Sequence, residues 1–185
     1  MSKGKLIVFS GCSGVGKSTV LSTLMQQRDD LLFSVSATTR APRAGEVEAV
    51  SYYFVSQEKF RQMIENDEFL EYDGHMDNYY GTPKAQLEEK LARGVVLLDI
   101  DPKGAFQVKK KRPDAVLVFI APPSMQVLEQ RLRSRGDTSD EQIEKRLKRA
   151  QWEMEQSVHY DYVVINEQVN ACTDAILEII AKNAD

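Results

Sequence analysis

This sequence has few cysteines and no apolar run long enough to cross a membrane. The two cysteines, Cys12 and Cys172, lie far apart and lack metal-type spacing, so they favour free thiols in a reducing compartment. The apolar run near the N-terminus, residues 6–9, is much shorter than the core of a signal peptide or a membrane span. We therefore expect a cytoplasmic protein that does not bind metal through cysteine.

Positive charge is not in excess either, because 24 Lys and Arg residues stand against 28 Asp and Glu residues. A net charge of −4 gives no general attraction to nucleic acid or to an anionic membrane, so any anion site has to be built locally. Linkers and low-complexity segments are also lacking, and 42% hydrophobic residues are enough for an ordinary core. We expect one domain over residues 1–185, with no nucleic acid, membrane or obligate protein partner.

The hydrophobic pattern alternates between short apolar runs and amphipathic segments. This alternation predicts an α/β fold, in which helices flank a parallel sheet. The expected core strands cover residues 6–9, 95–100, 115–120 and 162–165. The expected helices cover residues 17–28, 57–66, 83–93, 102–111, 124–135, 139–156 and 171–182. Thr138 and Ser139 provide overlapping capping boxes at the start of the sixth helix.

Residues 34–81 depart from this pattern, with short aromatic pieces such as SYYFVS and NYYGT. Such pieces favour strands, so we expect an inserted β-rich lobe here and a core made of residues 1–33 and 82–185. A second, charged segment at residues 131–149 is a candidate lid.

The segment GCSGVGKS, residues 11–18, fits the phosphate-binding pattern G-x-x-x-x-G-K-[ST]. It follows an apolar strand and opens a helix, as phosphate binding through backbone N–H groups and a helix N-terminus requires. Lys17 would reach the β- and γ-phosphates, and Ser18 would ligate Mg²⁺. The expected ATP-binding residues are Gly11, Cys12, Ser13, Gly14, Val15, Gly16, Lys17, Ser18 and Thr19. The alternative is a Gly-rich turn without a ligand, in which Cys12 is a small loop filler.

Acidic residues end the apolar strand in VVLLDID. Asp99 is a candidate Mg²⁺ ligand together with Ser18, directly or through water. Many strands end in an acid that only caps a turn, however, and Pro102 makes Asp101 a natural helix N-cap.

The segment TTRAPRAGE holds Arg40 and Arg43 three positions apart, in a stretch too rich in Pro and Gly for a helix. Two guanidinium groups suit one phosphate monoester. The hydroxyls of Tyr52, Tyr79 and Tyr80 are candidates to join them. The alternatives are solvated arginines and tyrosines that belong to the core.

Further segments follow GCSGVGKS in a fixed order: SVSATTRAPRAGEV, YYFVS, FLEY, NYYGTP, LLDID, FIAPPS and RLRSRG. Together they resemble guanylate kinase in its bacterial, single-domain form, over about residues 6–166. The resemblance implies a P-loop kinase fold with a GMP-binding lobe and a mobile lid. It also implies Mg²⁺-dependent transfer of the γ-phosphoryl of ATP to GMP, in purine nucleotide metabolism.

The resemblance also implies roles for individual residues. The GMP phosphate would be bound by Arg40, Arg43, Tyr52 and Tyr80, and the guanine by Ser36, Glu71, Thr82 and Asp101, with Asp99 also on the GMP side. Arg135 and Arg146 match lid arginines that contact the moving phosphoryl group, with Arg131 at the ATP side. The expected catalytic groups are Lys17, Arg40, Arg135 and Arg146. Arginines on a helix face are usually solvated, and Glu71 could instead pair with a nearby Lys or Arg.

Three positions depart from the family pattern. Ala49 and Asp77 stand where glycine is common, and Pro102-Lys103 replaces an apolar or Trp residue followed by Gln. Two other functions share the phosphate loop or the fold: a guanylate-kinase-like module that binds proteins, and a kinase of a sugar phosphate. The complete phosphate loop argues against the first, and Glu71 with Thr82 argues against the second.

Overall fold

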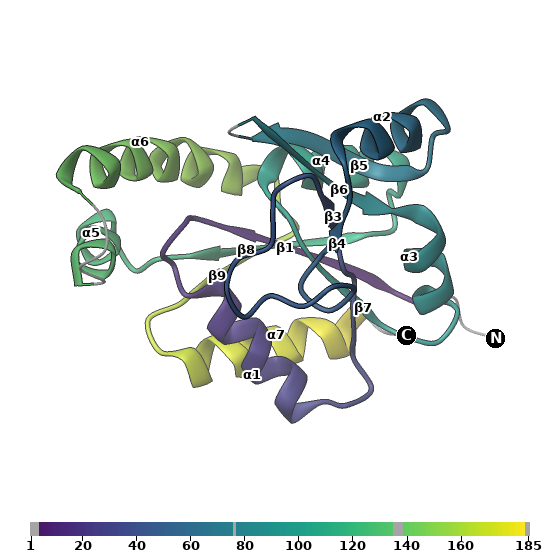
Figure 1. Ribbon diagram of the computed structural model, residues 1–185. Helices are drawn as coiled ribbons and strands as arrows, with labels where there is room; N and C mark the ends of the chain where they lie inside the picture. The colour runs from purple at the N-terminus through teal and green to yellow at the C-terminus, as the bar shows by residue number, and fades with distance from the viewer. Residues whose placement is uncertain (1–3, 76, 135–138, 184–185) are drawn as a thin grey trace. The chain divides into compact units, whose positions relative to one another are not determined.

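The computed structural model describes residues 4–75, 77–134 and 139–183 (Figure 1). The chain forms two compact units, each made of two stretches of sequence. Unit 1 contains Met1–Leu6 and Asp30–Ala115, and unit 2 contains Ile7–Asp29 and Val116–Asp185. The α/β class with parallel strands flanked by helices is confirmed.

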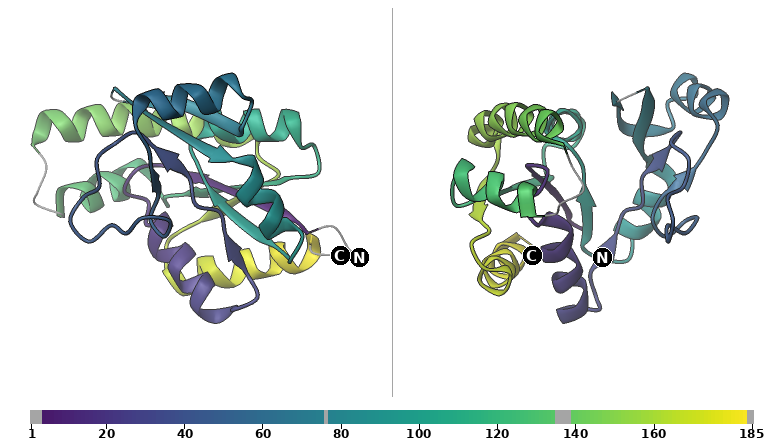
Figure 2. Two further views of the ribbon diagram at one scale, coloured as in Figure 1. Left: turned by 45° about the vertical axis from the view of Figure 1, so that its right-hand side comes forward. Right: turned by 60° about the vertical axis from the view of Figure 1, so that its left-hand side comes forward.

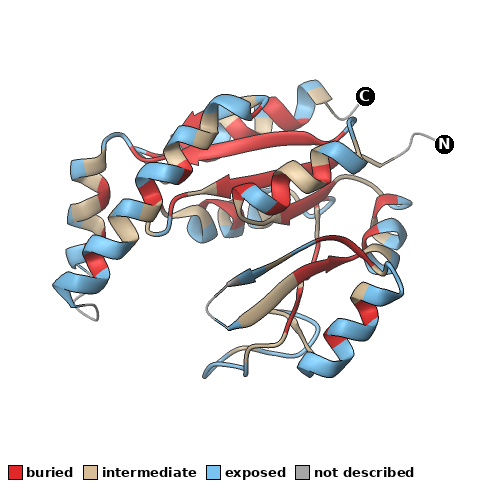
Figure 3. Cartoon of the chain, turned by 90° about the horizontal axis from the view of Figure 1, so that it is seen from above, coloured by how far each residue is buried: buried red, intermediate tan, exposed pale blue. Residues whose placement is uncertain are grey.

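Unit 2 is built on parallel strands in the order β1-β8-β9. They are β1 (Leu6–Gly11), β8 (Val116–Ala121) and β9 (Tyr162–Ile165). Its helices are α1 (Lys17–Gln27), α5 (Met125–Ser134), α6 (Asp140–Gln156), the short 3-10 helix η1 (Ser157–His159) and α7 (Val169–Asn183). Strand β8 is buried along its whole length (Figure 3), as expected of a parallel strand covered on both faces.

Unit 1 contains a second parallel pair and a separate sheet. Strand β2 (Leu32–Phe33) pairs with β7 (Val96–Asp99). The four-stranded sheet has the order β4-β3-β6-β5, with β3 (Ala37–Thr38), β4 (Tyr53–Phe54), β5 (Phe69–His75) and β6 (Asn78–Pro83). The helices are α2 (Gln57–Glu65), α3 (Lys84–Leu91) and α4 (Pro102–Lys111).

Helix α2 lies beside the four-stranded sheet (Figure 2), and a small hydrophobic core joins the two. The ring of Phe60 stacks on Phe69 at 4.4 Å between centroids and on Tyr79 at 5.4 Å. Tyr79 therefore packs in this core, as the alternative interpretation of the aromatic pieces held.

The expected helices and core strands lie within a few residues of the observed ones, and the predicted sixth helix starts at Ser139, one residue before the observed α6. Ser139 caps that helix, since its hydroxyl accepts a hydrogen bond from the Gln142 N–H at 3.4 Å, while Thr138 lies outside the described residues. The two-residue strand β2 was not predicted as part of the parallel sheet. No helix in the described residues is both long and apolar enough to span a bilayer.

Candidate active site

The phosphate loop of unit 2 joins β1 to α1. Gly14 and Gly16 have φ of 89° and 93°, in the left-handed region that glycine enters without strain. The Val15 N–H donates to the Cys12 carbonyl at 3.1 Å and closes a turn. Gly16 is the N-cap of α1 and makes no side-chain capping bond. The positive end of the helix dipole is thus available to an anion at this loop.

The loop is anchored through the carbonyl of Val15. The Nη1 of Arg131 donates to it at 3.1 Å, and the amide of Asn166 at 2.8 Å. Arg131 also donates to the Asn166 carbonyl at 2.9 Å. Arg131, expected at the ATP side, therefore contacts the backbone of the phosphate loop. The role of Asn166 was not predicted, although a buried polar residue just after a parallel strand is a recognisable site signal.

Cys12 is buried within the loop, and its thiol donates to the Ala150 carbonyl at 3.4 Å. Burial, followed by the nearby Glu153 carboxylate, raises the pKa of the thiol to about 12. Cys12 is therefore a neutral thiol near pH 7, which agrees with its interpretation as a loop filler.

Arg40 in unit 1 is bound by a residue that the sequence analysis did not assign. Both oxygens of Glu46 accept from its guanidinium, at 2.7 and 3.0 Å, and this carboxylate keeps the pKa of Arg40 above its usual range. Glu46 also accepts the backbone N–H of Arg43 at 2.7 Å. The guanidinium lies 5.5 Å from the ring centre of Tyr52, whose ring is 6.0 Å from that of Tyr80. Four expected phosphate ligands, Arg40, Arg43, Tyr52 and Tyr80, thus come from one part of unit 1.

Glu71 is buried, with 3% of its surface exposed. Its Oε1 accepts a hydrogen bond from the Thr82 hydroxyl at 2.6 Å, so this oxygen is bound by a hydroxyl group of the neighbouring strand. Burial raises the pKa of Glu71 to about 7 against the opposing effect of that bond, and the neighbouring carboxylates of Asp101 and Asp73 add to the rise. The oxygens of a buried carboxylate are suited to accept hydrogen bonds from ligand N–H groups.

Asp101 caps α4, because its Oδ1 accepts the Gly104 N–H at 2.9 Å. This contact confirms the helix N-cap that Pro102 predicted at Asp101. Asp99 ends β7 and is half-buried, as Ser36 is. Arg146 is half-buried on α6, and Arg135 lies outside the described residues.

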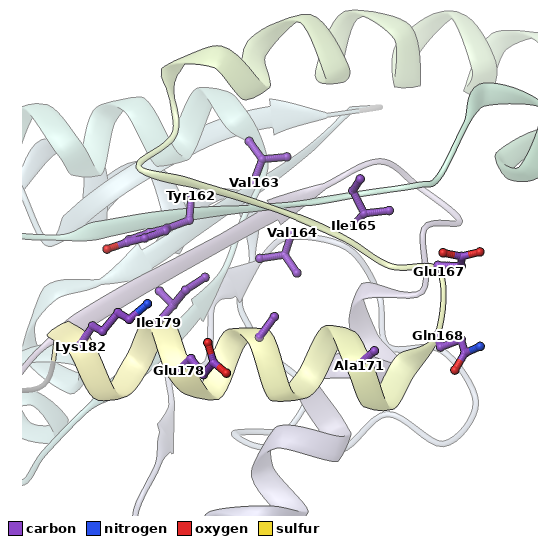
Figure 4. A pocket seen from close by; sticks show the side chains of 11 residues that line it. Tyr162, Val163, Val164, Ile165, Glu167, Gln168, Ala171, Glu178, Ile179 and Lys182 are labelled. Carbon is purple, nitrogen blue, oxygen red and sulfur yellow. The ribbon is translucent and has the colours of Figure 1, made fainter.

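A pocket of about 640 Å³ lies between β9 and α7 in unit 2 (Figure 4). Val164 points toward α7, whereas Val163 and Ile165 point away from it. None of the expected site residues lines this pocket, so its position gives no support to it as a nucleotide site.

Comparison with known proteins identifies the family. The guanylate kinase family model matches residues 3–183. A guanylate kinase of Prochlorococcus marinus is 44% identical over 95% of this chain and 96% of its own length. One of Caldanaerobacter subterraneus is 48% identical over 96% of this chain and 87% of its own length. The crystal structure of guanylate kinase from Anaplasma phagocytophilum is 35% identical, has a TM-score of 0.80, and aligns with 100% of this chain and 88% of its own. With its phosphate loop and these full-length matches, the chain belongs to the guanylate kinase family.

Proposed function

We propose that the protein transfers the γ-phosphoryl group of ATP to GMP, giving ADP and GDP, in the purine nucleotide metabolism of the cytoplasm. The observation that carries the acceptor assignment is the buried Glu71–Thr82 pair. Guanine presents N1–H and an amino group on one edge, and a carboxylate accepts hydrogen bonds from both. Adenine has an unprotonated ring nitrogen at the corresponding place, so it would leave the buried carboxylate unsatisfied.

ATP binds to the loop of residues 11–19, with Arg131 beside it. The backbone N–H groups of the loop and the start of α1 hold the phosphates, and Lys17 neutralises charge on the β- and γ-phosphates. The described residues contain no cluster of three or more Asp, Glu, His or Cys side chains that could hold a metal. The hydroxyl of Ser18 and the carboxylate of Asp99 are hard oxygen donors of the type that Mg²⁺ takes, so each is a candidate ligand of an ion that takes its other ligands from phosphates and water. When bound, Mg²⁺ neutralises developing charge on the phosphate oxygens.

GMP binds to unit 1. Arg40 and Arg43 hold its phosphate with the hydroxyls of Tyr52 and Tyr80, and Glu46 orients Arg40 for that contact. Glu71 binds the guanine, and the remaining contacts to the base come from Ser36, Thr82 and Asp101.

The reaction needs no general base, because an oxygen of the GMP phosphate is already an anionic nucleophile. Catalysis consists of aligning two polyanions and neutralising their charge with Lys17, Arg40, Arg135 and Arg146. The segment of residues 131–149 acts as a lid that excludes water from ATP.

A screen of phosphate acceptors tests this function, with ADP release from ATP as the readout. The acceptors are GMP, AMP, CMP, UMP and ribose phosphates, and GMP should be strongly preferred. The Lys17→Met variant is the control for the donor site: it should fold normally and lose phosphoryl transfer. A preference for a sugar phosphate, or full activity of Lys17→Met, would contradict the assignment.

A further inference from the structure

Gly104 lies in the first turn of α4, a position where glycine is unfavourable for the helix. Its φ is outside the left-handed region, because the positive-φ glycines of the described chain are Gly14, Gly16 and Gly45. An alanine could adopt the same backbone and has a higher helix propensity. The conformation of the backbone therefore does not explain the glycine.

The space beside Gly104 is occupied by Glu71. A Cβ added at Gly104 would lie 2.5 Å from Oε2 of Glu71 and 3.2 Å from its Cδ. The other carboxylate oxygen accepts from the Thr82 hydroxyl at 2.6 Å. The carboxylate is thus held between the Thr82 hydroxyl and the bare α-carbon of Gly104, and its burial restricts alternative positions.

Gly104 also contacts the second acid of this region, since its N–H donates to Oδ1 of Asp101 at 2.9 Å. An alanine keeps that N–H, so Gly104→Ala would preserve the cap of α4 while it crowds Glu71. We propose that Gly104 is a positioning residue for guanine recognition, because its missing side chain lets the carboxylate of Glu71 occupy the place from which it binds the base. This inference rests on the proposed function, in which Glu71 accepts hydrogen bonds from guanine.

The expected effect follows from the distances. A methyl group needs an ordinary van der Waals contact with Oε2, so the carboxylate has to withdraw by about 1 Å, a misplacement that typically costs about 10²-fold in a positioned reaction. The value of kcat/KM for GMP falls because both N–H donors of guanine bind the carboxylate, whereas AMP does not form these hydrogen bonds. The GMP-over-AMP ratio of kcat/KM therefore falls together with kcat/KM for GMP.

The test compares Gly104→Ala with wild type and with Gly74→Ala. In Gly104→Ala, kcat/KM for GMP falls about 10²-fold and the GMP-over-AMP ratio narrows, while KM for ATP is unchanged. Gly74 is a matched control on β5, the strand that carries Glu71, because its added Cβ meets nothing nearer than 3.7 Å. Gly74→Ala retains the wild-type constants.

A second background shows whether the effect passes through Glu71. In Glu71→Ala, both of the nearest atoms are gone, and the methyl of Ala at position 104 meets only Cδ1 of Ile100 at 3.3 Å, the far end of a side chain that has to shift by a few tenths of an ångström. Adding Gly104→Ala to Glu71→Ala should therefore leave the thermal stability and kcat/KM for GMP as they are in Glu71→Ala alone. This double variant keeps the test decisive even where Gly104→Ala alone does not fold.

Three results would overturn the inference: an unchanged GMP-over-AMP ratio in Gly104→Ala, an equal loss in both backgrounds, or an unfolded double variant beside a folded Glu71→Ala. These results are distinct from failure of the proposed function. That failure would appear in the wild-type protein itself, as the absence of a preference for GMP over AMP.

Discussion

At the scale of single residues, the titration of Glu71 makes the stability of the protein depend on pH. Its carboxyl group has a pKa of about 7 when folded, against 4.5 as the ordinary value, because burial disfavours the charge. The folded state binds this proton more tightly than the unfolded state does, so protonation of Glu71 stabilises the fold. This stabilisation is complete below the unfolded pKa and is lost as pH rises through about 7. We expect the unfolding free energy of wild type, relative to Glu71→Gln, to fall by on the order of 2 kcal/mol between about pH 5 and about pH 8.

Urea denaturation of both proteins at the two pH values measures this difference. Gln keeps the size of Glu71 and can still accept the Thr82 hydroxyl, so it serves as a neutral reference at every pH. A difference that stays constant with pH would mean that Glu71 is already ionised in the folded protein at acidic pH.

A substitution of Arg43 distinguishes the binding site of the GMP phosphate from that of the ATP phosphates. Its side chain is exposed and its backbone N–H, which binds Glu46, survives in Arg43→Ala. We expect KM for GMP to rise by roughly 10- to 100-fold in this variant, with KM for ATP unchanged, because charge-assisted bonds to the GMP phosphate are lost. Steady-state kinetics with each substrate varied in turn measures both constants. An equal loss of ATP affinity would remove Arg43 from the acceptor site.

At the scale of elements, three described residues with a Cβ carry backbone strain in the left-handed region: Ala49, Asp67 and Asp77. Ala49 and Asp77 have φ of 61° and 63°, and they are the two positions where the family resemblance leads us to expect glycine. A left-handed residue with a Cβ destabilises the folded state by roughly 1–2 kcal/mol. Replacing it with glycine removes this strain, but the greater freedom of glycine in the unfolded chain offsets part of the gain. We expect Ala49→Gly to stabilise the protein by about 0.5–1 kcal/mol in urea denaturation. Asp77→Gly should gain less, since Asp tolerates this conformation better than Ala.

Gly45→Ala is the matched control for this strain. Gly45 has φ of 85°, and a Cβ there meets no atom within 4 Å, so only the backbone conformation changes in energy. It should destabilise the protein by about 1 kcal/mol. If Ala49→Gly also destabilised it, the side chain of Ala49 would contribute more than its strained backbone costs.

Most of the elements were predictable because their signals are local. The span of α4 follows from Pro102 after an N-cap Asp, and β9 from an isolated apolar run. Strand β2 was missed because two residues carry no periodicity. The contact of Asn166 with Val15 joins residues 151 positions apart, and no sequence spacing reveals it.

The same limit applies within the candidate site. The motifs pointed to Arg40 and Glu71, but not to Glu46 as the partner of Arg40 or to Gly104 as the neighbour of Glu71. Such roles depend on how side chains of separate elements meet. The pairing of Glu71 with Thr82 likewise arises from the register of β5 against β6.

At the scale of the whole molecule, the proposed donor and acceptor residues divide between the two units, apart from Asp99, a proposed Mg²⁺ ligand that belongs to unit 1. Unit 2 holds the phosphate loop, Arg131 and Arg146, whereas unit 1 holds the arginines of TTRAPRAGE and the Glu71–Thr82 pair. Each set is held by contacts inside its own unit, such as Asn166 to Val15 or Gly104 to Asp101. Each nucleotide should therefore bind, by itself, to one unit without the other nucleotide.

Hydrogen exchange with each nucleotide alone tests this division, because a ligand slows the local opening of the segments that it binds. A non-hydrolysable ATP analogue should slow amide exchange in residues 11–19 and near Asn166. GMP should slow it in residues 36–46 and 69–83 and at the start of α4. Lys17→Met should weaken only the first pattern and Arg43→Ala only the second. If GMP alone protected residues 11–19 as strongly as residues 69–83, its binding groups would not be confined to unit 1, and the phosphate loop would have to contact the acceptor as well as the donor.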